Sequence, residues 1–275
     1  MKKYVSVMFF CACVTCMYVS GGTPTEVYPF YATKSCITNY AEGPVKQITI
    51  IKNLENVKDK IYDVNIIKKT YLYDIRGRLK KRECYFDDIL QNGYARLYIK
   101  NICIEQEYNS EGIIEGNYEL IRIDSMGRQI ASIHYDNSRF FSSDSTVYDE
   151  SGRATKYYST SGKRSKKFGL QYTYEYDSLG RFSKVRDFAY LGGEIFYHVE
   201  YHPNGNFTEH LTYKNGEDFC ECAVNEQGLI IERKCNDGQY SIFSDFDKYG
   251  NWLQVQTVKS DTDIFVTKRI IEYYE

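Results

Sequence analysis

A short phrase recurs along this chain and constrains its fold more than any other feature. Each copy starts with an aromatic or apolar residue, continues in most cases with Asp or Asn, and has Gly at the fifth position. Most copies lie about 25 residues apart, and such a period is typical of a repeat architecture. The copies begin at Tyr73, Tyr108, Ile123, Tyr148, Tyr176, Tyr201, Val224 and Phe246.

The phrase has the chemistry of a hairpin turn. Asp or Asn side chains accept bonds from backbone N–H groups further along the turn. Glycine supplies the left-handed conformation that closes a type I turn with a bulge. In such a hairpin the first residue faces the residue six positions later, as in Tyr73 with Leu79 and Phe246 with Trp252. We therefore expect a cross-strand pair beside each turn, and most of these pairs are apolar.

Further turn signals lie between the copies, and apolar and polar residues alternate on either side of them. Leu170, Tyr172, Tyr174 and Tyr176 share one face of a predicted strand, for example. Period two dominates over residues 45–275, which predicts an all-β repeat domain without an amphipathic helix. We expect an elongated antiparallel meander of repeated β-hairpins, in a sheet that is open or partly curled. The further signals are Asn92-Gly93, Ser161-Gly162, Gly192-Gly193, Asn215-Gly216 and Asp237-Gly238.

The form Tyr-Asp-x-x-Gly-Arg, found at Tyr73–Arg78, Tyr148–Arg153 and Tyr176–Arg181, resembles the YD repeat of RHS-type proteins. The chain is similar over residues 45–275 to small exported bacterial proteins with degenerate repeats of this kind, which are often lipoproteins. In large RHS proteins the repeats wind into a hollow shell, and about 230 residues cannot close such a shell. The resemblance implies a binding or scaffold role in the cell envelope.

The N-terminus has the layout of a secretory signal peptide over residues 1–22. Lys2 and Lys3 precede an apolar run of about 16 residues, and small residues follow it. That run is shorter than the roughly 20 residues of a permanent membrane helix. Residues 23–44 hold three of the four prolines and are predicted to form a linker or an N-terminal cap.

One interpretation of the cysteines in the leader is that one of them is lipidated. Val14-Thr15-Cys16 resembles the end of a bacterial lipoprotein signal, and Cys13 is the alternative lipidated residue. The other reading is ordinary cleavage near Gly21 or Gly22. Both readings predict export to the cell envelope, either as a lipid-anchored protein, including one at the cell surface, or as a periplasmic one.

An even number of cysteines remains after the leader, which permits disulfides in an oxidising compartment. Their spacing gives no zinc-knuckle signature. Use of these cysteines as apolar filler in strands is the alternative. The six are Cys36, Cys84, Cys103, Cys220, Cys222 and Cys235.

Composition and motifs exclude several classes of function. Charges nearly cancel, with 35 Lys+Arg against 37 Asp+Glu, so nucleic acid is not an expected partner. The sequence contains no Gly-x-Ser-x-Gly elbow and no Gly-rich phosphate loop. No pair of carboxylates is singled out for hydrolysis. We therefore predict a protein that is not an enzyme and needs no cofactor.

One group of residues could bind a metal ion. The predicted hairpin register places His198 opposite His210, and Glu200 lies on the same face of its strand. Two imidazoles and a carboxylate can hold zinc when they converge. The alternative is a solvated polar face without a metal.

The excess of tyrosine, 28 residues, suggests binding. Tyrosine side chains are stiff and amphipathic, which suits contacts to proteins or sugars. The alternative is that they form the packed face of the sheet. The candidate binding face comprises Tyr172, Tyr174, Tyr197 and Tyr201.

These features together predict an exported envelope protein that acts as a binding module. The expected partner is an unidentified protein or polysaccharide of the envelope, and membrane contact is expected only through a lipid anchor. A purely structural spacer is the first alternative. A secreted enzyme or a metal-binding protein that uses His198, Glu200 and His210 is the second.

Overall fold

The computed structural model describes residues 43–53, 66–160, 168–188, 195–213, 216–260 and 263–275. The predicted signal peptide, Cys13, Cys16 and nearly all of the predicted linker lie outside these residues. Within them the regular elements are all β-strands, as the alternation of the sequence predicted.

Eighteen strands make up the described structure. They are β1 (Val45–Asn53), β2 (Ile66–Tyr73), β3 (Leu79–Phe86), β4 (Ile89–Ile99), β5 (Ile102–Asn109), β6 (Ile114–Ile123), β7 (Gln129–Asp136), β8 (Arg139–Tyr148), β9 (Ala154–Thr160), β10 (Phe168–Tyr176), β11 (Phe182–Asp187), β12 (Ile195–Tyr201), β13 (Phe207–Tyr213), β14 (Gly216–Val224), β15 (Ile230–Cys235), β16 (Tyr240–Phe246), β17 (Trp252–Ser260) and β18 (Asp263–Tyr273).

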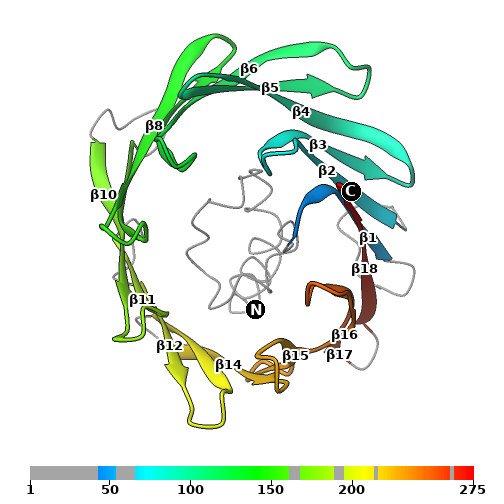
Figure 1. Ribbon diagram of the computed structural model, residues 1–275, viewed down its shortest axis with the longest axis vertical. Helices are drawn as coiled ribbons and strands as arrows, with labels where there is room; N and C mark the ends of the chain where they lie inside the picture. Colours follow the sequence, from blue (N-terminus) through cyan, green and yellow to red (C-terminus); the bar gives the residue numbers. More distant parts are fainter. Residues whose placement is uncertain (1–42, 54–65, 161–167, 189–194, 214–215, 261–262) are drawn as a thin grey trace, which may run out of the picture.

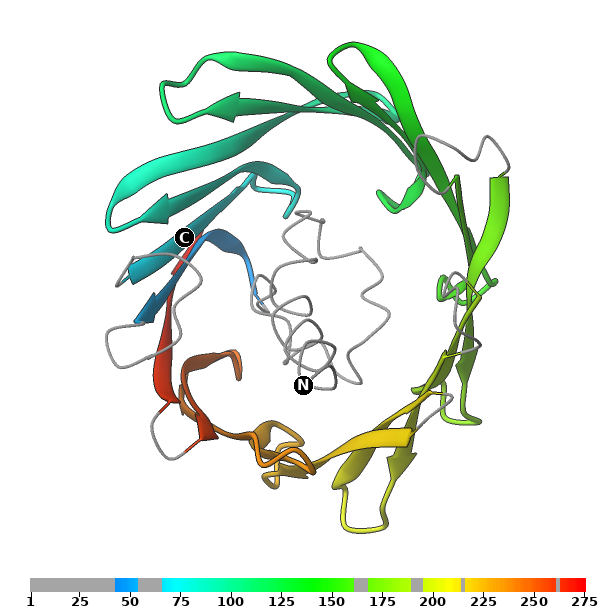
Figure 2. The same ribbon diagram turned by 180° about the vertical axis from the view of Figure 1, so that it is seen from behind.

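The strands form a closed antiparallel barrel. Each strand pairs with the next one along the chain, and β1 pairs with both β2 and β18. The seam runs from Val45 opposite Tyr273 to Lys52 opposite Thr267. Figures 1 and 2 show the resulting ring, in which β1 and β18 lie side by side.

The prediction of an open or partly curled sheet is therefore wrong, although the antiparallel meander itself is confirmed. Closure gives the backbone groups of the two terminal strands a partner, which removes the exposed sheet edges. A ring one sheet thick needs far less chain than the shell of a large RHS protein. The hairpins alone fix only local pairing, whereas closure depends on the twist accumulated over all strands.

The repeated phrase forms the predicted turn in all eight copies. Each first residue pairs with the residue six positions later, as Tyr73 does with Leu79. The eight glycines have φ values between 74° and 89°, which favour Gly over any other residue. In the first copy, Asp74 Oδ1 accepts bonds of 2.9 Å from the N–H groups of Arg76 and Arg78.

Seven of the eight turns lie at one end of the barrel, which we call the YD rim. The turn that begins at Tyr108 lies at the opposite end, because β5 runs away from the YD rim. Its place in the repeat is taken by Tyr98, which lies 25 residues after Tyr73 and 25 before Ile123. A two-residue turn at Lys100 and Asn101 follows it. This exchange explains the uneven spacing of the early copies.

Neighbouring repeats are tied together along the YD rim. The guanidinium of Arg153 lies 4.7 Å from the ring centre of Tyr176 in the next copy. The hydroxyl of Tyr176 donates a 2.9 Å bond to the carbonyl oxygen of Ala154. The same pair of contacts joins Arg128 to Tyr148 and Arg181 to Tyr201, so each repeat stabilises its neighbour.

The two faces of the sheet differ in packing. One face, here called the packed face, buries aromatic and aliphatic residues such as Tyr174, Val185 and Trp252. It also holds the ion pairs of Glu105 with Arg82 and Arg96, at 3.0 and 2.7 Å. Burial opposes the charge of Glu105, but Arg96 and then Arg82 hold its pKa below the usual range. Since closure makes side chains of the concave face converge, we assign the packed face to the inside of the ring.

One predicted turn is misplaced. Asn92 and Gly93 lie within β4, and the chain turns instead at Asp87 and Asp88, with φ of 45° and 65°. A Cβ atom on Gly93 would lie 2.1 Å from the ring of Tyr108, so glycine here makes room for that ring. Asp237-Gly238 is a turn as predicted, while Ser161-Gly162, Gly192-Gly193 and Asn215 lie outside the described residues.

Closure of the barrel can be tested by a cross-link over the seam. Ile51 of β1 pairs with Lys268 of β18, so Ile51→Cys and Lys268→Cys together should form a disulfide on mild oxidation. Peptide mapping by mass spectrometry would detect it. The control combines Ile51→Cys with Gln254→Cys, one strand further away, and should give no such bond. A failure of the first pair to cross-link in the folded protein would contradict the seam.

The turn aspartates should make the free energy of unfolding depend on pH. Burial opposes the charge of Asp124, but the N–H and guanidinium of Arg128 and the N–H of Met126 hold its pKa below the usual value. A depressed pKa stabilises the fold above the unfolded pKa of about 3.9, and this contribution is lost as pH falls through the folded pKa. Asp124→Asn should cost about 1 kcal/mol or less at pH 7, since solvent screens the pair, and less at pH 2 than at pH 7.

Urea unfolding at the two pH values would measure the difference for Asp124→Asn. Glu150→Gln, in the neighbouring turn, is the control and should leave the free energy of unfolding unchanged at both. An equal loss at pH 7 and pH 2 would mean that charge at Asp124 does not stabilise the turn.

Candidate functional site

Three of the four histidines gather on the exposed face of β12–β14 and the turn between the first two strands. His198 of β12 pairs directly with His210 of β13, as the sequence predicted. The two rings are stacked, with centroids 4.4 Å apart and planes inclined by 2°. His202 lies in the turn, where its Nε2 is 2.9 Å from the hydroxyl of Thr208. The alternation of β12 and β13 places these side chains on one surface.

Carboxylates lie on either side of His210. Glu217 of β14 has its Oε1 3.0 Å from His210 Nδ1. Glu200 of β12, the carboxylate predicted from sequence, has its Oε2 3.9 Å from His210 Nε2. Ligand atoms of His198, His210 and Glu217 all lie within 4.8 Å of one another. Among the described residues, this is the group of His, Cys, Asp and Glu side chains with the geometry to hold a metal ion.

Sequence reasoning missed Glu217. A two-residue turn at Asn215-Gly216 would pair His210 with Glu221, whereas in the structure Gly216 already pairs with Tyr213, and His210 pairs with Phe219. Glu217 is therefore a diagonal neighbour of His210, within reach of a long side chain.

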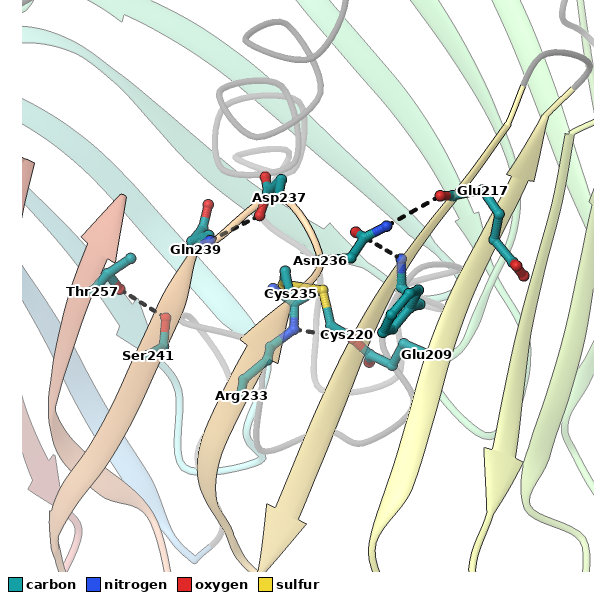
Figure 3. The surroundings of a disulfide bond; sticks show 11 residues. Glu209, Glu217, Cys220, Arg233, Cys235, Asn236, Asp237, Gln239, Ser241 and Thr257 are labelled. Carbon is teal, nitrogen blue, oxygen red and sulfur yellow. Dashed lines mark hydrogen bonds and ion pairs between the residues drawn. A yellow bond between two sulfur atoms is a disulfide. The ribbon is translucent and has the colours of Figure 1, made fainter. Parts of the chain in front are cut away.

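The segment around Glu217 is held by the next hairpin, which Figure 3 shows. The side-chain amide of Asn236 donates 3.2 Å to the carbonyl of Glu217 and accepts 3.1 Å from the N–H of Phe219. A disulfide joins Cys220 of β14 to the opposing Cys235 of β15. These bonds fix the backbone that carries Glu217.

The electrostatics keep His198 neutral near pH 7. Burial is the largest cause that lowers its pKa from the ordinary value, followed by the nearby His210 ring and, more weakly, Lys184. Lys184 pairs with His198 across β11 and β12. A neutral imidazole retains a nitrogen lone pair, which is the form that binds a metal ion.

A shallow groove of about 310 Å³ lies beside the histidines, towards the YD rim. Thr208 connects the two regions, because it pairs with Glu200 on one side and Glu221 on the other. The groove is mainly polar, and Glu232 and Lys234 of β15 also line it. No ligand class follows from this lining alone.

The predicted tyrosine face lies elsewhere, on the packed face. Tyr174 and Tyr197 are each only 7% exposed and belong to the largest core cluster, against which Tyr172 and Tyr201 pack. The hydroxyl of Tyr201 donates to the carbonyl of Phe182. These four side chains therefore act in packing, and the structure does not bring them together with the histidines.

An apolar patch occupies the exposed face of β4–β7. Leu97, Ile104, Leu120 and Ile133 form one continuous cross-strand row. Ile99 and Ile102 pair beside it, at the Lys100-Asn101 turn. Leu97 is 58% exposed and Ile133 37%. Contiguous aliphatic side chains on an exposed face are a feature typical of interaction surfaces.

No protein-family model and no curated protein matches this chain. A porin-like protein from Bacteroides uniformis ATCC 8492 is similar over 85% of this chain and 100% of its own, at 12% identity and a TM-score of 0.47. TcdB2-TccC3-TEV and TcdB2-TccC3-Cdc42 match 72% and 76% of this chain, at 10% and 9% identity and TM-scores of 0.33 and 0.34.

The chain spans only 12% and 14% of the length of the last two structures. At these identities and TM-scores, function has to be argued from the residues of this chain. The resemblance of its turns to YD repeats accordingly stays a prediction. Within the part of the chain described, no helix is long and apolar enough to cross a membrane.

The pKa of His198 should depend on the presence of the stacked His210 ring. His210→Ala removes the second largest cause of the lowered pKa of His198, so that pKa should rise towards 6.5. Ring-proton NMR over a pH titration would measure the change. The control is His134→Ala on β7, which should leave the His198 titration unchanged. An unchanged pKa in His210→Ala would mean that the rings are not adjacent in solution.

Proposed function

We propose that this protein is an exported envelope protein that binds another envelope protein through the apolar patch on β4–β7. The observation that carries the proposal is the exposed row from Leu97 to Ile133. Removing these side chains from water on binding would be favourable, by roughly 25 cal/mol for each Å² of apolar surface. Aliphatic side chains suit a protein surface better than a polysaccharide, which stacks on aromatic rings.

Two further observations support export. The N-terminal layout is that of a secretory leader, as argued from the sequence. The cross-strand disulfide between Cys220 and Cys235 fits an oxidising compartment. Lipidation at Cys16 or Cys13 would then hold the barrel at a membrane surface.

The rest of the exposed face supports binding to a protein rather than insertion of the barrel into lipid. Lys184, Glu200 and Lys234 lie on this face over β11–β15. A charged side chain facing lipid costs about 2–4 kcal/mol near the bilayer midplane.

Affinity capture from solubilised envelope proteins tests the proposal. The full-length protein should retain a partner, and Leu97→Ser with Ile133→Ser should lose it while the melting temperature stays the same. Ile242→Ser is the matched control, because Ile242 is 40% exposed but pairs with Glu232 and Gln256 instead of apolar residues. This control should still retain the partner.

Retention of the partner by the double serine variant would refute the patch as the binding site. Capture of no protein by any of the three would favour the alternative of a structural spacer. Binding of the native protein to protein-free phospholipid vesicles, lost in the double variant, would identify the patch as a lipid-binding surface and contradict the proposal.

A further inference from the structure

We propose that the exposed face of β12–β14 carries a divalent transition-metal site of the zinc class. His198, His210 and Glu200 are the ligands, and Glu217 is a positioning residue. The site lies on a different part of the barrel from the apolar patch on β4–β7. It is therefore independent of the proposed binding function.

The hydrogen bond between His210 and Glu217 fixes which ring nitrogen of His210 carries the proton. The carboxylate of Glu217 lies 3.0 Å from Nδ1 and can only accept a hydrogen bond, so Nδ1 must carry the hydrogen. The lone pair of the neutral ring is then on Nε2. Histidine ligands of zinc are oriented in this way, with the second ring nitrogen donating to a carboxylate.

The Nε2 atom of His210 has no hydrogen-bond partner among the described residues. It is buried and makes no hydrogen bond, although His210 as a whole keeps 18% of its side chain exposed. A buried nitrogen lone pair without a partner is costly, and binding of a cation would satisfy it. Glu200 Oε2 lies 3.9 Å from this atom, and it is the nearest carboxylate on that side.

His198 supplies the second imidazole from the opposing strand. A ligand nitrogen of its ring lies within 4.8 Å of one of the His210 ring. The centroids of the stacked rings lie 4.4 Å apart. Two nitrogen ligands on one zinc ion lie closer, about 3.3 Å apart, for zinc–nitrogen distances of 2.0–2.1 Å and tetrahedral angles. Binding therefore requires the His198 ring to turn about its side-chain bonds, while the bond to Glu217 holds the His210 ring in place.

The donor set selects the metal class. Two imidazoles with one carboxylate suit zinc and neighbouring transition metals, whereas calcium and magnesium prefer oxygen ligands alone. Three protein ligands leave the fourth zinc position for water. The charges around the site are Glu200 and Glu217, which favour a cation, and Lys184 on β11, which opposes it.

Isothermal titration of the full-length protein with zinc chloride at pH 7.5 tests the proposal. One ion should bind per chain. His198→Ala and His210→Ala should each weaken binding at least about tenfold, as should Glu200→Gln. The matched controls are His134→Ala and Glu221→Gln, which should bind zinc like the native protein. Far-ultraviolet circular dichroism and thermal melting would establish that each variant is folded.

Glu217→Gln tests the positioning role separately. It should weaken zinc binding but keep the stoichiometry, and a cobalt-loaded sample should keep its tetrahedral visible spectrum. Affinity in the native protein should be lower at pH 5.5 than at pH 7.5, because protons compete with zinc for the imidazole nitrogens. A native affinity that does not change between pH 7.5 and 5.5 would overturn the assignment of histidine ligands.

Two other outcomes would overturn the proposal. The first is no uptake of zinc by the native protein. The second is uptake that survives in both His198→Ala and His210→Ala, which would place the ion on other residues such as the cysteines. Complete loss in Glu217→Gln with native affinity in Glu200→Gln would overturn the roles given to the two carboxylates.

Discussion

The backbone pairing of β1 with β18 is the constraint on which the rest of this structure depends. A sheet of eighteen strands, one layer thick, has no second sheet or helix layer among the described residues to cover it. Curvature brings the side chains on its concave face closer together, so that neighbours on this face bury one another's apolar surface. Closure fixes that curvature and leaves neither terminal strand with unpaired backbone groups.

The YD rim shows how a repeated turn contributes to this closure. Each turn orders its own loop through the Asp or Asn side chain, and the Arg of several copies also covers the tyrosine of the next repeat. The tyrosine hydroxyl then binds a carbonyl in the preceding repeat, so the contact runs around the ring from one hairpin to the next. Near the seam, the hydroxyl of Tyr274 donates 2.7 Å to the carbonyl of Tyr73 and continues this pattern across the joint. The repeats therefore stabilise both the local turns and the ring.

Because the packed face is occupied by its own contacts, function is assigned to the exposed face. That face is not uniform. An aliphatic row lies on β4–β7, and a polar surface with three histidines lies on and beside β12–β14. The two regions have different chemistry and are built on different strands, so a partner protein and a metal ion would not compete for one site. The tyrosines that suggested binding in the sequence are used to hold the ring together.

The sequence by itself determined the strands, the turns and the local pairing. Asp or Asn in most copies, and Gly in all of them, specify the turn through short-range bonds and positive φ, and the opposition of His198 and His210 follows from one such turn. Glu217 was not within reach of the same reasoning, because a turn at Asn215-Gly216 would set a register two residues away from the observed one. Only the tertiary structure decided that the meander closes, since β1 and β18 are more than 200 residues apart and no local pattern encodes their pairing. Closure in turn decided which face is packed. It placed Tyr174 and Tyr197 on the packed face and left Leu97 and Ile133 exposed, because both faces carry apolar side chains and curvature decides which of them is buried.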